Sequence, residues 1–182
     1  QTQVRVILGA SGYGKTDYGA LLGVGHKISQ DNNYRALLMT KEKTRGNEII
    51  SATREALIGN NYKPKNRSNF VIRLPGLVGK DPNYIAKSIR SKGIRGRHPD
   101  IVLMDDPITP DDDSPAERRR VFKVYEELLK VAPRIAIYGQ PVHKLDLYQN
   151  LRPLVPCLEF IYGDIPELDV DLDAQRKAGV SE

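Results

Sequence analysis

The sequence has little sulfur and no long apolar stretch. Its 182 residues include one cysteine, so no disulfide can form within the chain. A chain without a disulfide framework is typical of a reducing, intracellular setting. No apolar run approaches the roughly 18 residues that a membrane-spanning helix needs, so we expect no membrane partner. The three histidines are not spaced as a metal site.

The composition is that of a folded domain. Hydrophobic residues make up 40% of the chain and charged residues 28%, which argues against a disordered or collagen-like chain. The length corresponds to one domain with little left over. The net charge of +5 favours polyanionic partners, nucleic acid among them.

Short apolar, β-rich runs recur between helical patterns. Nearly continuous apolar runs are typical of parallel strands that are covered on both faces. Strands that alternate with helices predict an α/β fold with a doubly wound, mostly parallel sheet. The predicted strands are Val4–Leu8, Ala36–Met39, Phe70–Leu74, Ile101–Met104, Arg134–Tyr138 and Leu158–Tyr162.

The clearest helix signal begins at Ser114. This serine is followed by Pro115 and, three residues after it, by Glu117, which is the pattern of a capped helix start. The apolar residues that follow fall on one helical stripe, and Pro133 is expected to end the pattern.

A phosphate-binding pattern follows the first predicted strand. It matches G-x-x-x-x-G-K-[ST], the Walker A motif, at every fixed position and precedes a plausible helix. Its glycines let successive backbone N–H groups point at a phosphate, and the helix N-terminus adds positive charge. We expect Lys15 to reach the β- and γ-phosphates and the Thr16 hydroxyl to bind Mg²⁺. The predicted nucleotide-binding residues are Gly9, Ala10, Ser11, Gly12, Tyr13, Gly14, Lys15 and Thr16.

Two acids end another buried strand, as the second half of a nucleotide site requires. Asp105 closes the apolar run and is placed to hold Mg²⁺, directly or through water. Asp106 is placed to polarise the water that attacks the γ-phosphate. The alternative for Asp106 is a turn residue before Pro107, since aspartate favours such turns.

The strand Arg134–Tyr138 ends in Gly139 and Gln140. In P-loop ATPases with an extra strand between the two nucleotide motifs, a polar residue at this strand end senses the γ-phosphate. Gln140 is the candidate for that role, and a simple turn ahead of Pro141 is the alternative.

Three segments between Ser91 and Leu151 carry a family resemblance. They are Gly93–Asp100, then Ile101–Asp106 with Pro107 and Ile108, and finally Gly139–Leu147. In this order, with the loop Gly9–Thr16, they resemble the ATPase motor domain of the large terminase subunit of tailed bacteriophages. The resemblance implies a P-loop fold of the RecA-like type, with an extra strand between the two nucleotide motifs.

The sequence departs from the family pattern at three positions. Gln140 stands where many relatives have threonine, Val142 where they have tryptophan, and Asp106 where glutamate is more frequent. The family also has a nuclease domain. The resemblance therefore divides the chain into an ATPase domain, residues 1–163, and a tail or the start of a linker to an absent nuclease domain, residues 164–182.

The resemblance also implies a mechanism and partners. The cofactors would be ATP and Mg²⁺, and the partners would be double-stranded DNA and the portal and small terminase subunits, in the cytoplasm of the infected bacterium. The chain would assemble as a homo-oligomeric ring, with a monomer as the alternative for the isolated domain. Arg95 matches the family's arginine finger, with Arg97 in reserve; a phosphate-contacting or merely solvated basic loop is the alternative. Candidate DNA contacts are Lys63, Lys65, Arg67 and Arg97.

Three functions compete at this point. The first is an ATP-hydrolysing motor that translocates DNA into a procapsid. The second is another nucleic-acid-dependent P-loop ATPase, of the helicase or recombinase kind. The third is a DNA-binding module that assembles when ATP is bound and hardly turns over. The paired acids Asp105 and Asp106 favour turnover over pure switching.

Overall fold

The fold was analysed in a computed structural model. It describes residues 2–9, 14–65, 68, 70–91, 94, 96–109, 114–140, 145–155 and 157–159. The strands are β1 (Gln3–Leu8), β2 (Ala36–Thr40), β3 (Val71–Ile72), β4 (Tyr84–Ser88), β5 (Ile101–Asp105), β6 (Arg134–Gly139) and β7 (Cys157–Glu159). The helices are η1 (Asp17–Gly23), α1 (Val24–Gln30), α2 (Lys43–Gly59), α3 (Pro115–Leu128) and α4 (Leu147–Leu151).

The seven described strands form one sheet in the order β3-β4-β2-β5-β6-β1-β7. Every neighbouring pair is parallel except β3 and β4, which are antiparallel. β6 lies between β1, which leads into the predicted phosphate loop (Gly9–Thr16), and β5, which ends at Asp105 and is followed by Asp106. The predicted α/β fold with an extra strand between the two nucleotide motifs is therefore confirmed.

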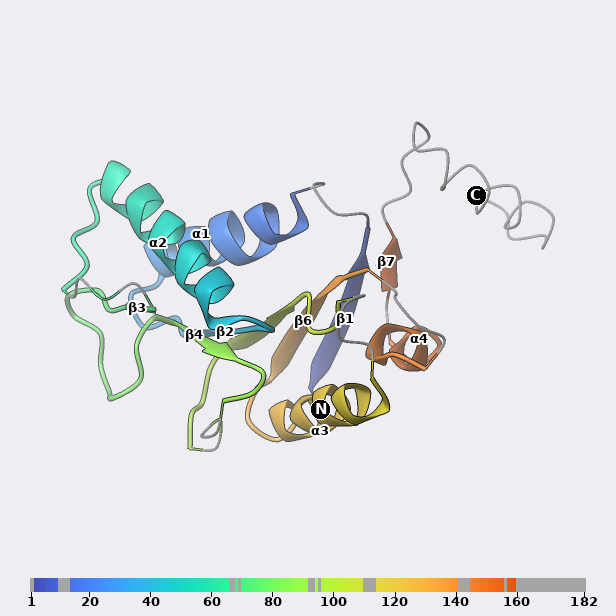
Figure 1. The fold of residues 1–182 in the computed structure, drawn as a ribbon. Helices are drawn as coiled ribbons and strands as arrows, with labels where there is room; N and C mark the ends of the chain where they lie inside the picture. Colours follow the sequence, from blue (N-terminus) through green and yellow to red (C-terminus); the bar gives the residue numbers. More distant parts are fainter. Residues whose placement is uncertain are drawn as a thin grey trace.

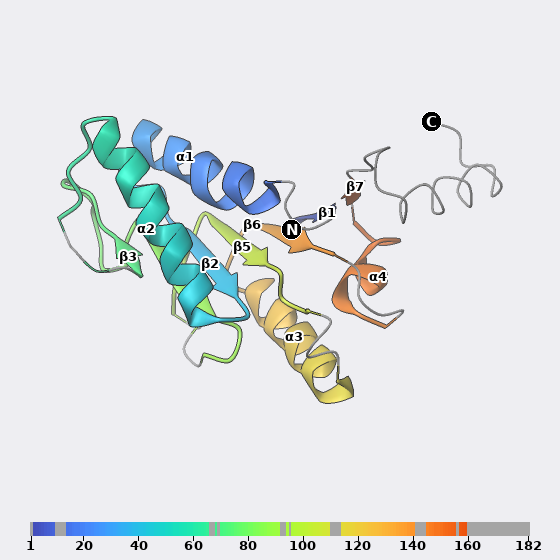
Figure 2. The same ribbon diagram turned by 45° about the horizontal axis from the view of Figure 1, so that its top comes forward.

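Helices cover both faces of the sheet, as its apolar strands require. η1, α1 and α2 pack on one face, and α3 and α4 pack on the other (Figure 1). The turned view shows the same division, with α1 and α2 side by side (Figure 2). Side chains alternate between the two cores along each strand: in β5, Val102 and Met104 join the α3 side, and Leu103 joins the α1 side.

Helix α3 begins where its sequence signal places it. The Ser114 hydroxyl accepts a hydrogen bond from the Glu117 N–H at 3.2 Å, and proline occupies the first helical position. Val121, Tyr125 and Leu128 point into the core and are buried. The cap and the apolar stripe together fix which face of α3 packs on the sheet.

The sheet differs from its prediction at both edges. The predicted strand Phe70–Leu74 is reduced to two residues and runs antiparallel. β4 was not predicted, although it pairs with β2 along five residues. Its start depends on Asn83, which is fully buried; the Asn83 side chain donates to backbone carbonyls of the segment before β2 and accepts from the Leu74 N–H. β7 begins one residue earlier than predicted.

The helix that follows the phosphate loop is wound in two ways. η1 is π-helical and continues without a break into the α-helical α1. Within η1, the carbonyl of Ala20 accepts a hydrogen bond from the buried Tyr84 hydroxyl at 2.6 Å. Gly19 lies against Tyr138: a Cβ at this position would come within 2.2 Å of the Tyr138 hydroxyl oxygen. The π-helical segment therefore sits tightly on β4 and β6.

Among the described residues, no helix combines the length and the apolar character that crossing a bilayer would require.

Candidate functional site

The carboxyl ends of β1, β6 and β5 meet at one edge of the sheet. In the strand register, Leu8 pairs with Gly139 and Tyr138 pairs with Asp105. The N–H of Gly9 donates to the Gly139 carbonyl at 3.2 Å, so the chain is still tied to β6 where it leaves β1. The first residue of the phosphate loop and both acids thus lie around the end of β6.

In the described part of the predicted phosphate loop, one glycine has a left-handed backbone. Gly14 has φ +68°, a left-handed conformation that favours glycine, and its carbonyl accepts from the Tyr18 N–H at the start of the helix. The Lys15 ammonium donates to the Gly9 carbonyl at 2.5 Å, so it lies beside the first residue of the motif. Ala10, Ser11, Gly12 and Tyr13 lie outside the described residues.

Thr16 and Asp105 lie in contact, although 89 residues separate them in the chain. The Thr16 hydroxyl donates to the Asp105 Oδ1 at 2.5 Å. Asp105 is buried, with 3% of its surface exposed. This contact brings together the two side chains that the sequence assigns to the metal, one from the helix after the phosphate loop and one from the end of β5.

Burial disfavours the charged form of the Asp105 carboxyl group. Burial raises its pKa, and the hydrogen bond from Thr16 and the charges of Arg45 and Lys15 only partly offset this. Burial likewise lowers the pKa of Lys15, against the attraction of Asp106 and Asp105. A divalent cation between Asp105 and a phosphate would supply the positive charge that this edge of the sheet needs.

The donor set fits Mg²⁺ rather than a metal held by protein alone. Among the described residues, no group of three or more histidine, cysteine or acidic side chains is placed to hold a metal. Mg²⁺ typically keeps several waters and binds one or two carboxylates together with substrate phosphates. A threonine hydroxyl and a carboxylate beside a phosphate loop match that arrangement.

Asp106 has an unusual backbone and an accessible carboxylate. Its φ is +42°, in the left-handed region, and its N–H donates to the Tyr138 carbonyl at 3.0 Å. The residue is exposed, yet desolvation by the surrounding protein raises the pKa of its carboxyl group, while the charges of Lys15 and Arg45 lower it. Asp106 is thus a turn residue before Pro107 and also presents a carboxylate beside Lys15.

Two basic residues near the acids were missed by sequence reasoning. Arg45, in the first turn of α2, lowers the pKa of both Asp105 and Asp106 by its charge. Lys41, directly after β2, donates to the Thr109 hydroxyl in the segment after Asp106. Both follow the end of the strand next to β5, and basic residues at that strand end are the signal that could have found them.

The other predicted site residues are placed as follows. Gln140 is exposed and directly follows β6. Lys63 and Lys65 are exposed in the segment after α2. The Arg97 guanidinium binds the Asp81 carboxylate at 3.1 Å and is partly buried. Arg95 and Arg67 lie outside the described residues.

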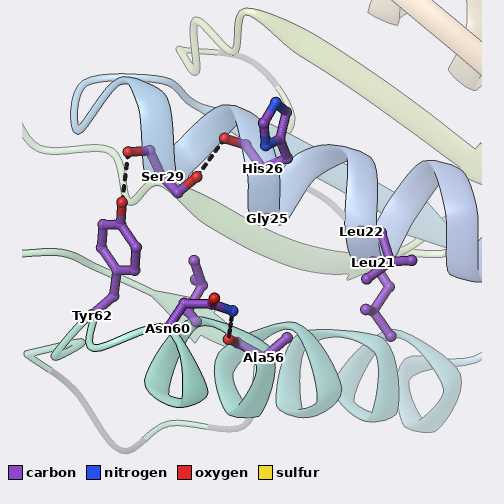
Figure 3. A pocket seen from close by; sticks show the side chains of 9 residues that line it. Leu21, Leu22, Gly25, His26, Ser29, Ala56, Asn60 and Tyr62 are labelled. Carbon is purple, nitrogen blue, oxygen red and sulfur yellow. Dashed lines mark hydrogen bonds between the residues drawn. The ribbon is translucent and has the colours of Figure 1, made fainter.

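A cavity of about 460 Å³ lies between η1 and α1 on one side and α2 on the other. Polar groups that line it form hydrogen bonds with one another. The Tyr62 hydroxyl donates to the Ser29 carbonyl at 2.9 Å, and the Asn60 amide donates to the Ala56 carbonyl at 2.8 Å (Figure 3). Its described lining includes no acidic, lysine or arginine side chain, and neither Thr16 nor Asp105. It is therefore separate from the candidate nucleotide site.

Comparison by sequence finds no relative. No protein-family model matches the chain, and no curated protein does.

Comparison of the fold finds viral packaging proteins. The N-terminal domain of the DNA packaging ATPase from bacteriophage phi29 is 12% identical, with a TM-score of 0.57 over 91% of this chain and 92% of that one. The large terminase ATPase domain of a Thermus phage is 13% identical, with a TM-score of 0.54 over 100% of this chain and 85% of that one. The large terminase of a thermophilic bacteriophage, in complex with ADP, is 14% identical, with a TM-score of 0.51 over 96% and 44%.

The fraction of each similar protein that the alignment covers shows which part of it this chain resembles. The chain spans nearly the whole phi29 domain but less than half of the ADP-bound large terminase. Its fold matches that of a packaging ATPase domain, at identities too low to carry over residue roles. The chain therefore has the fold of the ATPase domains of bacteriophage DNA-packaging motors, the large terminase subunits among them.

Proposed function

We propose that this chain is the ATP-hydrolysing motor domain of a viral DNA-packaging terminase. The observation that carries the proposal is the 2.5 Å contact between the Thr16 hydroxyl and the Asp105 carboxylate, at the edge of the sheet where the phosphate loop begins. The fold it shares with packaging ATPases supports the choice of motor over other P-loop proteins.

Polar groups of the candidate site form hydrogen bonds with one another. The Lys15 ammonium donates to the Gly9 carbonyl, and the Thr16 hydroxyl donates to the Asp105 carboxylate. A bound triphosphate would take the Lys15 ammonium on its β- and γ-phosphates. Thr16 and Asp105 would hold Mg²⁺, which supplies charge neutralisation at the phosphates. The two side chains that we assign to the metal are therefore already in contact with each other.

Asp106 is the residue that we assign to the chemical step. Its carboxylate is accessible, unlike that of Asp105, and can accept a hydrogen bond from the attacking water. The raised pKa of its carboxyl group makes it a better proton acceptor than an ordinary surface aspartate. Gln140, at the end of the neighbouring strand, is the proposed sensor of the γ-phosphate.

The motor function needs a neighbouring subunit and DNA. We assign Arg95 to the active site of an adjacent subunit in a ring, where it would stabilise charge on the transferring phosphoryl group. Lys63, Lys65, Arg67 and Arg97 would contact the DNA backbone without reading its sequence. Engagement of Arg97 with DNA would compete with its ion pair to Asp81.

Two substitutions test the nucleotide site. Lys15→Ala should abolish binding of ATP with Mg²⁺, measured by isothermal titration calorimetry, because it removes the only charged side chain of the loop. Asp106→Asn should keep ATP affinity within about twofold and reduce kcat by on the order of 10²–10⁴, the usual contribution of a general base. Hydrolysis is measured as phosphate release with and without double-stranded DNA.

Matched controls lie on exposed helix faces. Lys27→Ala, in α1, and Glu126→Gln, in α3, remove the same kinds of charge away from the site and should leave binding and turnover unchanged. Normal ATP binding by Lys15→Ala would remove the nucleotide site from this edge of the sheet. Unimpaired hydrolysis by Asp106→Asn would remove the base assignment alone.

A further experiment separates the motor from its alternatives. Mixing Arg95→Ala with Lys15→Ala should partly restore hydrolysis, because each variant supplies what the other lacks across a subunit boundary. ATP binding that promotes assembly on DNA, with no turnover in any mixture, would favour the ATP-gated binding module. Unwinding of duplex DNA would favour a helicase.

A further inference from the structure

The backbone of Asp106 is held in a conformation that a residue with a side chain rarely adopts. Asp106 comes directly after β5, and its φ of +42° turns the chain toward Pro107. Left-handed backbone costs energy in residues other than glycine, so the surrounding contacts must maintain it. One of these contacts is the hydrogen bond from the Asp106 N–H to the Tyr138 carbonyl.

The same carbonyl accepts a second hydrogen bond, from Tyr148. The Tyr148 hydroxyl donates to the Tyr138 oxygen at 3.4 Å, and the Asp106 N–H donates to it at 3.0 Å. The backbone of Ile108, two residues after Asp106, also lies close enough to the hydroxyl to lower its pKa, against the larger effect of burial. Tyr148 thus joins the end of β6 to the segment that carries Asp106.

The position of the Tyr148 hydroxyl is closely determined. The side chain is fully buried, and α4, on which it lies, is capped by the buried Asp146, which accepts from the Gln149 N–H at 2.9 Å. The ring lies over Gly139, where a Cβ would come within 1.8 Å of the hydroxyl oxygen. Burial, and then the charge of Asp106, raise the pKa of Tyr148 well above its ordinary value, so the hydroxyl remains protonated and able to donate.

We propose that Tyr148 is a positioning residue for the ATPase reaction: its hydroxyl donates to the same Tyr138 carbonyl that accepts from the Asp106 N–H, and so holds Asp106 in the conformation that aims its carboxylate at the attacking water. The proposal rests on the proposed function, because it presupposes that Asp106 acts on a water beside the γ-phosphate. A tyrosine that only filled the core would need no hydroxyl at this place.

Tyr148→Phe tests the hydroxyl while it keeps the ring. We expect kcat for ATP hydrolysis to fall by roughly tenfold or more, as expected when a catalytic group is misplaced by a fraction of an ångström. The KM and the Kd for a non-hydrolysable ATP analogue should stay within about twofold, because Lys15, Thr16 and Asp105 are untouched. The matched control is Tyr125→Phe, a buried tyrosine of the same core on α3, which should leave kcat unchanged.

A double-mutant cycle separates positioning from general loss of stability. If Tyr148 acts through Asp106, then Tyr148→Phe should cause no further loss of single-turnover rate in the Asp106→Asn background. Equal losses in both backgrounds, or an unchanged kcat in Tyr148→Phe, would overturn the proposal.

A readout without catalysis keeps this test distinct from the proposed function. Amide hydrogen exchange at Asp106 and Ile108 should accelerate in Tyr148→Phe and not in Tyr125→Phe, because only the first releases the segment. If the wild-type protein neither binds nor hydrolyses ATP, the proposed function fails, and exchange alone still decides whether Tyr148 holds this backbone. Unchanged exchange at both amides would refute the positioning role in either case.

Discussion

The two faces of the sheet support different halves of the candidate site. On the α1 face, the Tyr84 hydroxyl bonds the Ala20 carbonyl and so holds η1, the segment that follows the phosphate loop. On the α4 face, the Tyr148 hydroxyl donates to the Tyr138 carbonyl, which also accepts from the N–H of Asp106 in the segment that follows β5. Both tyrosines are fully buried. For the proposed ATPase we therefore expect that ligand binding and the chemical step depend on separate hydroxyl groups and can be separated by mutation.

The largest effect is expected at Gly139, on the α4 face. A Cβ there would lie 1.8 Å from the Tyr148 hydroxyl oxygen and 2.3 Å from its ring carbon Cζ, so Gly139→Ala must displace the ring. We expect the free energy of unfolding in urea to fall by about 3 kcal/mol, as for an overpacked core. Gly59→Ala is the control, since a Cβ there meets nothing within 4 Å. An unchanged unfolding midpoint for Gly139→Ala would show that the ring does not lie over β6.

Gly19→Ala makes the corresponding change on the α1 face and should cost less. The new Cβ would lie 2.2 Å from the Tyr138 hydroxyl oxygen, but alanine favours a helical backbone over glycine by about 1 kcal/mol. We expect a net loss of about 1–2 kcal/mol in the same urea experiment. A loss equal to that of Gly139→Ala would mean that the two faces are packed with equal rigidity.

Tyr84→Phe sharpens the division between binding and chemistry. Removing its hydroxyl leaves the Ala20 carbonyl without that donor, which should cost about 1 kcal/mol of stability. Because η1 continues from Lys15 and Thr16, affinity for ATP should fall several-fold by calorimetry while kcat at saturating ATP stays near the wild-type value. A fall in kcat with unchanged affinity would contradict the assignment of the α1 face to binding.

The smallest effect is expected for Asp105→Asn. This substitution should stabilise the ligand-free protein but reduce the stabilisation that ATP and Mg²⁺ provide. Burial raises the folded-state pKa of Asp105, so its contribution to stability is fully present below the unfolded value of 3.8 and is lost as pH rises through the raised pKa. Asp105→Asn should therefore stabilise the ligand-free protein at pH 7, with the difference shrinking toward pH 4.

Thermal melts with ATP and Mg²⁺ complete this prediction. The ligand should raise the melting temperature of the wild-type protein more than that of Asp105→Asn, because an amide is a poorer ligand for Mg²⁺ than a carboxylate. Equal stabilisation of both proteins by the ligand would argue against Asp105 as a metal ligand.

Local patterns predicted the centre of the fold. The phosphate loop and the acids after β5 lie next to continuous apolar strands, so both the residues and their places at strand ends follow from short stretches of sequence. The contact between Thr16 and Asp105 follows in turn, because parallel strands bring their carboxyl ends to one edge.

Contacts between distant segments were not predictable in this way. β4 has a short apolar run and a polar end, and its start depends on the buried Asn83, whose partners come from two other segments. Arg45 affects the acids from the first turn of α2, and the basic residues after β2 become a useful signal only once the strand order places β2 next to β5. The contact of the Tyr148 hydroxyl with the end of β6 depends on how α4 packs, which no local pattern shows.

The winding of η1 sets how Thr16 is turned about the helix axis relative to the buried side of α1. A π-helical turn contains more residues than an α-helical one, so each residue advances by a smaller rotation about the axis. If Asp17–Gly23 rewound as an α-helix, Thr16 would turn about the axis relative to Val24 and Ile28. Those two side chains are fixed in the core, so the rotation would fall on Lys15 and Thr16 and carry Thr16 away from Asp105. The contact between Thr16 and Asp105, which we propose as metal ligands, is thus tied to the pitch of one helix.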